Sequence, residues 1–151
     1  MFKVVLYQPE IPQNAGNIAR TCAATGAQLH LVRPLGFRWA SSELKRAGLD
    51  YWSALDYVLH DSWRAFLEAL PQGSRVWAYS SKVTQLYTEV EYRPGDYLIF
   101  GPESRGLPPE VLAHFPAVTI PMPGSGRSLN LAVAVGVGLY EALRQVNFQA
   151  R

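Results

Sequence analysis

The feature that most constrains the fold is a regular alternation of short apolar runs with segments whose apolar residues recur at helical spacing. Short apolar runs between turn residues are typical of buried strands, and their alternation with helices is typical of a mostly parallel sheet. We therefore predict an α/β fold in which a mostly parallel sheet is flanked by helices. The strands are expected at residues 2–7, 28–32, 57–60, 75–79, 97–100 and 117–120.

The first predicted helix follows the first strand, where apolar residues from Ala15 to Ala23 share one helical face. Asn14 is expected to cap its N-terminus and Gly26 to end it, which leaves Arg20 projecting off the apolar face. Further helices are predicted at residues 42–47, 62–70, 108–114 and 129–146.

The last predicted helix is unusual because it carries no charged residue from Leu129 to Tyr140. Such a helix is expected to be buried around its whole circumference, yet it is too short for a membrane span, which needs about 20 apolar residues. Gly136 and Gly138 each cost about 0.8–1 kcal/mol of helix stability relative to alanine, which indicates close backbone packing. Because a small domain offers one core surface, we predict a homodimer whose interface includes this helix.

The length of 151 residues and the 48% hydrophobic content suit one globular domain over residues 1–151. The first residues lack the charged region, apolar run and cleavage site of a signal peptide, so we expect a cytoplasmic protein. One cysteine, Cys22, rules out an intramolecular disulfide and leaves too few sulfur ligands for structural zinc. His30, His60 and His114 are scattered without ligand spacing, so no metal is expected and each histidine is predicted to be structural or exposed.

Three predicted strands end directly in loops rich in glycine, proline and small polar residues, at 79–81, 101–106 and 121–128. Because ligands bind outside the carboxyl ends of strands in open α/β sheets, these loops are expected to converge on one pocket. Any one loop alone could be a simple turn, but three at the same edge indicate a ligand site. Gly101 would let the backbone approach a ligand closely.

Two polar residues, Ser128 and Asn130, stand at the start of the last predicted helix. Unpaired N–H groups and the positive end of the helix dipole favour an anionic group there, such as an amino-acid carboxylate. Helix capping explains Ser128 equally well, whereas Asn130 is harder to explain as a cap.

Other cofactor and catalytic signatures fail at specific residues. Gly124-Ser125-Gly126 lacks the third glycine of a dinucleotide fingerprint, since Leu129 stands there, and Arg105-Gly106-Leu107 lacks the lysine of a phosphate-binding loop. Ser104 and Ser128 have no evident histidine and acid partners for a hydrolase triad. A dehydrogenase and a serine hydrolase are therefore disfavoured.

The segment at residues 33–46 is distinctly basic. It contains Phe37 and Trp39, one acidic residue, Glu43, and four basic residues, Arg33, Arg38, Lys45 and Arg46. Basic side chains beside aromatic rings suit phosphate contact and base stacking on single-stranded RNA. The alternative is a solvated loop whose aromatic residues pack on the core.

Three motifs resemble those of the SpoU-TrmD (SPOUT) methyltransferases: residues 14–20 (NAGNIAR), residues 100–106 (FGPESRG), and IPM at 120–122 with RSLNLA at 127–132. The resemblance runs nearly end to end. It is greatest to the short branch that 2'-O-methylates the wobble cytidine or uridine of tRNA, through LYQPEIPQN at 6–14, RAGLDY at 46–51 and YEA at 140–142. The chain departs from that branch at residues 123–126, which are more glycine-rich than usual.

The resemblance implies a C-terminal trefoil knot, an S-adenosylmethionine cofactor, a tRNA substrate (leucine tRNAs in that branch), and an obligate dimer with the site at its interface. It assigns cofactor binding to Tyr79, Gly101, Ile120, Met122 and Ser128, and the catalytic surround to Asn14, Arg20, Glu103, Ser128 and Asn130. Without an RNA-binding extension the dimer itself must grip the RNA, so we assign RNA contact to Arg33, Arg38, Lys45, Arg46 and Arg127.

Arg20 is the family's candidate for activating the ribose 2'-hydroxyl. A guanidinium is a poor base at neutral pH, because its ordinary pKa lies above about 12. We therefore expect Arg20 to act as a cation that stabilises the developing alkoxide and holds the adjacent phosphate, while the proton leaves through phosphate or water. Two alternatives stay open: another tRNA or ribosomal RNA nucleotide as the target, and a non-catalytic RNA-binding dimer of the same fold.

Overall fold

The computed structural model describes residues 1–39, 42, 44, 46 and 53–149. Six strands form one sheet in the order β3-β2-β1-β5-β4-β6, and every pairing in it is parallel. The strands are β1 (Lys3–Tyr7), β2 (Gln28–Val32), β3 (Tyr57–His60), β4 (Val76–Tyr79), β5 (Tyr97–Phe100) and β6 (Ala117–Val118). The predicted α/β fold with a parallel sheet is confirmed, although β6 is shorter than the strand predicted there.

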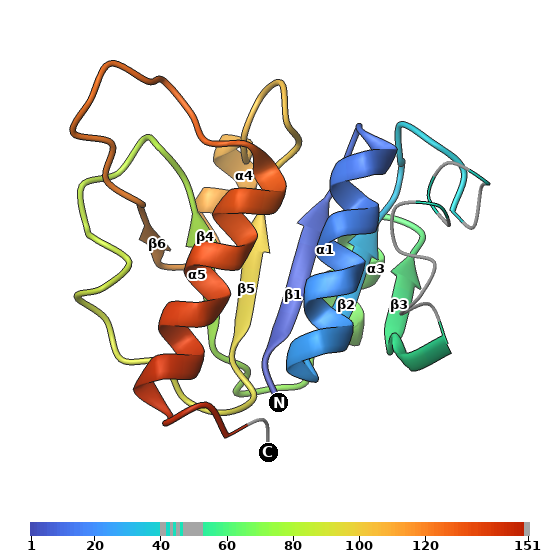
Figure 1. Cartoon of the computed structure of the whole chain (residues 1–151), viewed down its shortest axis with the longest axis horizontal. Coiled ribbons are helices and arrows are strands. Elements are labelled where there is room, and N and C mark those ends of the chain that lie inside the picture. The colour runs from blue at the N-terminus through green and yellow to red at the C-terminus, as the bar shows by residue number, and fades with distance from the viewer. Residues whose placement is uncertain (40–41, 43, 45, 47–52, 150–151) are drawn as a thin grey trace.

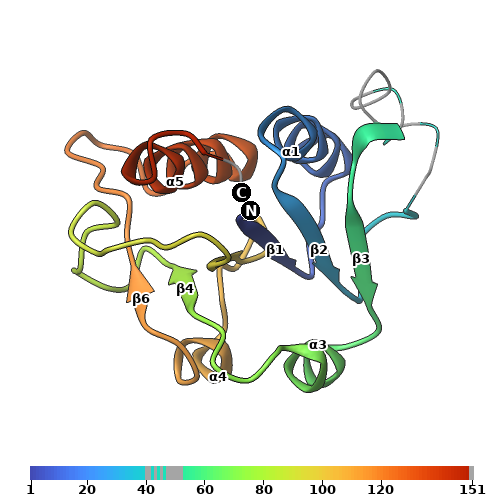
Figure 2. The ribbon, with the colours of Figure 1, turned by 90° about the horizontal axis from the view of Figure 1, so that it is seen from below.

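Helices cover both faces of the sheet (Figure 1, Figure 2). On one face lie α1 (Pro12–Thr25) and α5 (Leu131–Gln145), and on the other lie α3 (Trp63–Ala69) and α4 (Pro109–Leu112). Because the central strands are covered on both faces, β5 is buried along its whole length and β1 at all but its first residue. Of the helix predicted at residues 42–47, residues 43, 45 and 47 lie outside the described residues.

The start of α1 differs from the prediction. The helix begins at Pro12 with Ile11 as the N-cap, and proline suits the first position because its missing N–H would have no helical partner. Asn14 therefore lies inside the first turn rather than at the cap. The predicted end of the helix is confirmed, since Gly26 adopts the left-handed conformation with a φ of 77°.

Of the two polar residues before α5, the cap is Asn130, which was harder to explain as a cap from the sequence, and not Ser128. Asn130 is the N-cap, and its side-chain oxygen accepts hydrogen bonds from the N–H groups of Ala132 and Val133 at 2.9 and 3.2 Å. Ser128 is exposed and lies outside the helix. Asparagine serves as this cap because its short side chain brings an oxygen to the second and third N–H groups of the helix.

Only one side of the apolar helix α5 is buried within the single chain. Leu139 and Leu143 are buried in the core, whereas Val133 and Tyr140 on the outer side are 52% and 49% exposed. A single chain therefore does not bury the whole circumference of this helix, and the prediction that a second surface covers it is not tested. No described helix is long and apolar enough to cross a membrane.

The two glycines of α5 have different surroundings. A Cβ at Gly138 would lie 2.8 Å from the ring of Tyr79, so the predicted close packing is confirmed at this position. A Cβ at Gly136 would meet nothing within 4 Å, so close packing is not found there within the chain. Gly136 leaves space on the helix for an approach from outside.

His30 and His60 are in contact, although they lie far apart in the sequence. The parallel pairing of β2 with β3 places both beside Phe66 of α3, where His30 Nδ1 lies 2.8 Å from His60 Nε2. Burial lowers the pKa of His30 to about 4 and also lowers that of His60, so both are neutral core residues at neutral pH. Within the described ranges, no group of three His, Cys, Asp or Glu side chains could hold a metal ion.

Candidate active site

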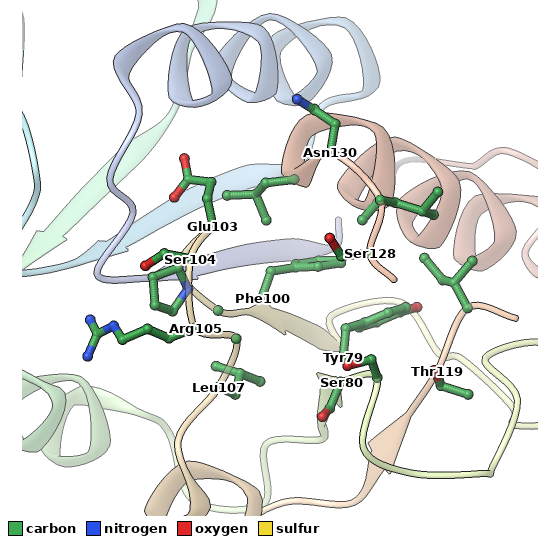
Figure 3. Close-up of a pocket in the computed structure, with 18 of the residues that line it drawn as sticks. Tyr79, Ser80, Phe100, Glu103, Ser104, Arg105, Leu107, Thr119, Ser128 and Asn130 are labelled. Atoms are coloured by element: carbon green, nitrogen blue, oxygen red, sulfur yellow. The ribbon is translucent and has the colours of Figure 1, made fainter. Parts of the chain in front are cut away.

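A cleft of about 480 Å³ opens at the carboxyl edge of the sheet. Its walls are the loops that follow β4, β5 and β6 together with the starts of α1 and α5 (Figure 3). The predicted convergence of these loops is confirmed, and the volume is that of a small-molecule site. The cleft is lined by all five residues assigned to the cofactor, namely Tyr79, Gly101, Ile120, Met122 and Ser128.

Two stacked aromatic rings form an apolar wall of the cleft. Tyr79 at the end of β4 and Phe100 at the end of β5 have ring centroids 4.5 Å apart. The Tyr92 hydroxyl donates to the carbonyl of Tyr87 at 2.8 Å, so the Tyr79 hydroxyl, 2.7 Å from that of Tyr92, must be the donor to it. Burial raises the pKa of Tyr92 to about 12 and also raises that of Tyr79. Neither phenol is therefore a base at neutral pH, and both hold the wall in place.

The loop after β5 closes tightly on itself. A Cβ at Gly101 would overlap the backbone of Gly106 and Leu107, so only glycine fits. Gly106 has a φ of 70°, and its N–H donates to the carbonyl of Pro102 at 2.9 Å. The close backbone approach predicted at Gly101 is made by the loop itself, which fixes the shape of this wall.

Two glutamates hold the loop after β5 against the start of α1. The Glu103 carboxylate accepts hydrogen bonds from the N–H groups of Glu10 and Ile11 at 2.8 and 2.9 Å. In return, the Glu10 carboxylate accepts from the hydroxyl and the N–H of Ser104 at 2.8 and 2.9 Å. The hydrogen bond from the Ser104 hydroxyl has the larger effect and that from the Ser104 N–H the smaller, and both lower the pKa of Glu10. Glu10 is therefore an anion at neutral pH. We call these reciprocal contacts of Glu10 and Glu103 the glutamate clasp.

Two asparagines extend the glutamate clasp to the last helix. Asn14 donates from Nδ2 to Glu103 at 3.1 Å, and its side-chain oxygen accepts from Asn130 Nδ2 at 3.1 Å. Glu103 and Asn130 both point toward α1 in Figure 3. Three residues assigned to catalysis, Asn14, Glu103 and Asn130, therefore line the cleft and are joined by hydrogen bonds through Asn14. Ser128, also assigned to catalysis, lines the cleft as well. The hydrogen bonds of the first three residues fix the starts of α1 and α5 relative to the loop.

Arg20 does not line the cleft of its own chain. It is exposed on α1, and the residues that form the cleft do not include it. It stands six positions after Asn14, which at the rise of an α-helix is about 9 Å along the axis. The two residues share a motif in the sequence, but the helix places one at the cleft and the other away from it.

The described residues that were assigned to RNA contact are not among those that line the cleft. Arg33 pairs with Asp61 at 3.0 Å on the surface, and Lys45 lies outside the described residues. Trp39 packs against Tyr57, with ring centroids 5.0 Å apart, and against the core, which favours the packing alternative for this ring. The other basic residues assigned to RNA are all exposed: Arg38, Arg46 and Arg127.

Several residues of the site were not predicted from the sequence. Glu10 and Ser104 form the glutamate clasp, and Lys82 and Arg105 are the basic residues that line the cleft. The position of Glu10 just after a central strand was a usable signal, because that edge of the sheet was the expected ligand edge. Its pairing with Ser104, 94 residues away, gave no signal in the sequence.

Comparisons with known sequences find one protein family and several similar proteins. Residues 1–140 match the SpoU rRNA Methylase family. The chain is 48% identical to the tRNA (cytidine(34)-2'-O)-methyltransferase of Escherichia coli strain K12, over 98% of this chain and 96% of the relative. It is 49% identical to the protein of the same name from Saccharophagus degradans, over 98% of this chain and 97% of the relative.

Solved structures are similar over the same extent. One, solved for the 2-OH methylation of C/U34 on tRNA, has a TM-score of 0.96 and 65% identity, covering 99% of this chain and 98% of that one. An AdoMet-bound rRNA methyltransferase from Sinorhizobium meliloti has a TM-score of 0.87 and 30% identity, covering 96% of this chain and 56% of that one. With a family match over nearly its whole length, this chain belongs to the SpoU rRNA Methylase family.

Proposed function

We propose that this chain transfers the methyl group of S-adenosylmethionine to the ribose 2'-hydroxyl of the wobble nucleotide of tRNA, either cytidine or uridine. The observation that carries the proposal is the cleft, whose walls include residues of all three sequence motifs. The names of relatives that match nearly the whole chain support the wobble nucleotide as the target. We propose leucine tRNAs as substrates, the cytoplasm as the location, and residues 1–151 as one catalytic domain.

The cleft suits S-adenosylmethionine in size and in chemistry. This cofactor supplies an electrophilic methyl group on a sulfonium. The stacked rings of Tyr79 and Phe100 offer an apolar wall for a flat adenine, and the start of α5 suits an amino-acid carboxylate. We propose that the cofactor is held by the five residues predicted for it, Tyr79, Gly101, Ile120, Met122 and Ser128.

We infer that the working form is a homodimer that packs through the outer side of α5. This side exposes Val133 and Tyr140, and Gly136 leaves room for a close approach. Large exposed apolar side chains on one helix favour a protein interface. A mass measured by light scattering at micromolar concentration should be that of a dimer, and a monomeric mass would contradict the inference.

The proposed dimer also accounts for a catalytic role of Arg20. Because α1 and α5 lie side by side on one face of the sheet (Figure 1, Figure 2), a partner packed against α5 is also next to α1. We propose that Arg20 of the partner subunit reaches the cleft, where it stabilises the developing alkoxide and holds the adjacent phosphate. The absence of Arg20 from the residues that line the cleft of its own chain supports this proposal.

The residues of the cleft then have separate tasks. Asn14, Glu103 and Asn130 act by position, because their side chains are bonded to one another and to the starts of two helices. Ser128 lies exposed beside the start of α5, where it can contact the cofactor. No histidine is found among the described residues that line the cleft, which favours loss of the hydroxyl proton to phosphate or water.

We further propose that the C-terminal part forms the trefoil knot implied by the family. After β6, the backbone of Thr119 bonds to Gln85 and Tyr87 at 2.8 and 2.9 Å, on the far side of the chain from β4. Farther on, Gln145 of α5 bonds to Val90 and Tyr92 of the same loop. These contacts support a path in which the C-terminal segment passes through the loop that follows β4.

Replacing Arg20 tests the proposed function. We expect Arg20→Ala to lower methyl transfer to unmodified tRNA by at least about 100-fold while the calorimetric affinity for S-adenosylmethionine changes less than about twofold. Arg64→Ala, at an exposed arginine of α3 on the opposite face, serves as the control and should transfer methyl groups normally. Loss of cofactor binding in Arg20→Ala would refute this role. A wild-type protein that binds no S-adenosylmethionine would instead favour the non-catalytic RNA-binding dimer.

A further inference from the structure

Arg105 stands at the rim of the cleft. It lines the cleft and is exposed, and in Figure 3 its guanidinium points outward from the loop after β5. Its Nη2 donates a hydrogen bond to Oε1 of Gln8 at 3.1 Å. This partner is a neutral amide, so the bond orients the guanidinium without neutralising its charge.

Four arginines elsewhere in the chain are paired with carboxylates. Ion pairs at 2.9–3.0 Å are formed by Arg33, Arg75, Arg93 and Arg144. Within the part of the chain that the structure describes, Arg105 forms no such ion pair. The carboxylate of Glu10 on the neighbouring segment accepts its hydrogen bonds from Ser104, and Arg105 contributes only a weaker electrostatic attraction that also lowers the pKa of Glu10. A guanidinium has five N–H donors, so most of those on Arg105 are available to an anion.

Gln8 is part of a backbone segment that is fixed on both sides. It has a φ of 49°, which residues other than glycine seldom adopt, and its N–H donates to the carbonyl of Val32 at 3.0 Å. The carbonyl of Pro9 accepts from the N–H of Gly36 at 2.9 Å, and a Cβ at Gly36 would lie 2.6 Å from the carbonyl oxygen of Glu10. Residues 8–10 therefore join the loop of the cleft to the basic segment that begins at Arg33.

We propose that Arg105 binds a phosphate of the tRNA strand next to the target nucleotide, and that Gln8 is the positioning residue that orients it. The inference rests on the proposed function, because a target ribose lying over the cleft brings its neighbouring phosphates to the rim. Arginine matches phosphate with paired N–H donors. Since the phosphate is the same beside every base, the contact serves cytidine and uridine targets equally.

Binding of tRNA at several salt concentrations tests this assignment. Unmodified leucine tRNA transcripts with cytidine or uridine at the wobble position are titrated with the wild-type protein and with Arg105→Gln. We expect Arg105→Gln to raise the Kd about tenfold for both transcripts and to lower the slope of log Kd against log salt by about 0.7. The Kd for S-adenosylmethionine should stay unchanged.

Two further variants sharpen the test. Gln8→Glu gives Arg105 a carboxylate partner while leaving the arginine in place, and it should raise the Kd for tRNA in the same direction. Arg93→Gln makes the same charge change at an arginine paired with Glu91 at the opposite edge of the sheet, and tRNA binding should be unaffected. All variants are compared after their thermal unfolding curves are shown to match that of the wild type.

The outcomes separate this inference from the proposed function. If Arg105→Gln and Arg93→Gln bind tRNA equally well, the phosphate contact is overturned. If Arg105→Gln weakens S-adenosylmethionine binding rather than tRNA binding, Arg105 belongs to the cofactor site and the inference is also overturned. Failure of the proposed function would show differently, as tRNA binding by the wild-type protein without any methyl transfer.

Discussion

The two edges of the sheet are both held by carboxylates, but they are built differently. At the amino edge the Asp96 side chain is only 2% exposed, and it accepts hydrogen bonds from Arg75 Nε, Trp77 Nε1 and the N–H of Arg93 at 2.9–3.0 Å. At the carboxyl edge the glutamate clasp is partly exposed and joins segments more distant in the sequence. Asp96 bonds to residues of nearby segments, whereas Glu10 and Glu103 join the loop after β1 to the loop after β5.

The two edges are expected to contribute differently to stability and to activity. A buried carboxylate with three donors leaves several polar groups without partners when it is lost, which lowers the free energy of unfolding. The glutamate clasp holds the loops at the rim, so that the cleft stays open while its walls are fixed. We therefore expect changes at the amino edge to act mainly on stability, and changes at the carboxyl edge to act mainly on binding and transfer.

The largest effect is expected at the tightest point of the carboxyl edge. In Gly101→Ala the added Cβ would overlap the backbone of Gly106 and Leu107, so the loop must move. Because small displacements of a site cost about 100-fold in rate, methyl transfer should fall by that factor or more, with a parallel loss of S-adenosylmethionine affinity. Gly124→Ala is the control, since a Cβ there meets nothing within 4 Å. Wild-type cofactor affinity in Gly101→Ala would show that this loop does not shape the site.

The next effect is expected at the amino edge. Asp96→Asn keeps the shape of the side chain but replaces one acceptor oxygen with an amide NH2 group. This NH2 group then faces other N–H donors, either those of Trp77 and Arg93 or that of Arg75. The free energy of unfolding, measured with denaturant, should fall by about 2–3 kcal/mol. Methyl transfer below the unfolding temperature should stay within about twofold of the wild type. A large loss of transfer by folded protein would contradict the separation of the two edges.

The smallest effect on stability is expected at the glutamate clasp. Glu103→Gln makes the same chemical change as Asp96→Asn, but at a partly exposed side chain, so the free energy of unfolding should fall by less than about 1 kcal/mol. Methyl transfer should still fall by about tenfold, because the loop is no longer fixed to Glu10, Ile11 and Asn14. Glu68→Gln on exposed α3 is the control. The comparison fails if Glu103→Gln costs as much stability as Asp96→Asn and leaves transfer unchanged.

The sequence predicts what depends on local pattern. The strands follow from runs such as Tyr97–Phe100, and the end of α1 follows from Gly26, because burial and left-handed backbone each leave a local signal. The convergence of three loops follows from a general property of parallel sheets rather than from any single residue. Fold class and the place of the cleft could therefore be predicted.

The sequence does not predict what depends on packing between distant segments. Glu10 meets Ser104 only because the loops after β1 and β5 end side by side, and His30 meets His60 only through the register of β2 with β3. Asn14 was predicted as a cap because helix starts commonly use asparagine, but Pro12 begins the helix earlier. The distance of Arg20 from the cleft follows from helix geometry, which a linear motif does not display.

The central claim is that this cleft serves ribose methylation at the wobble nucleotide, and mapping the modified nucleoside tests it most directly. Unmodified total tRNA is incubated with the protein and S-adenosylmethionine, and the modified nucleoside and its position are identified by mass spectrometry. We predict a 2'-O-methylated cytidine or uridine at position 34, formed only when the cofactor is added, as the names of the relatives indicate. A methyl group on a base, a ribose methylated at another position, or no methyl transfer at all would contradict the account.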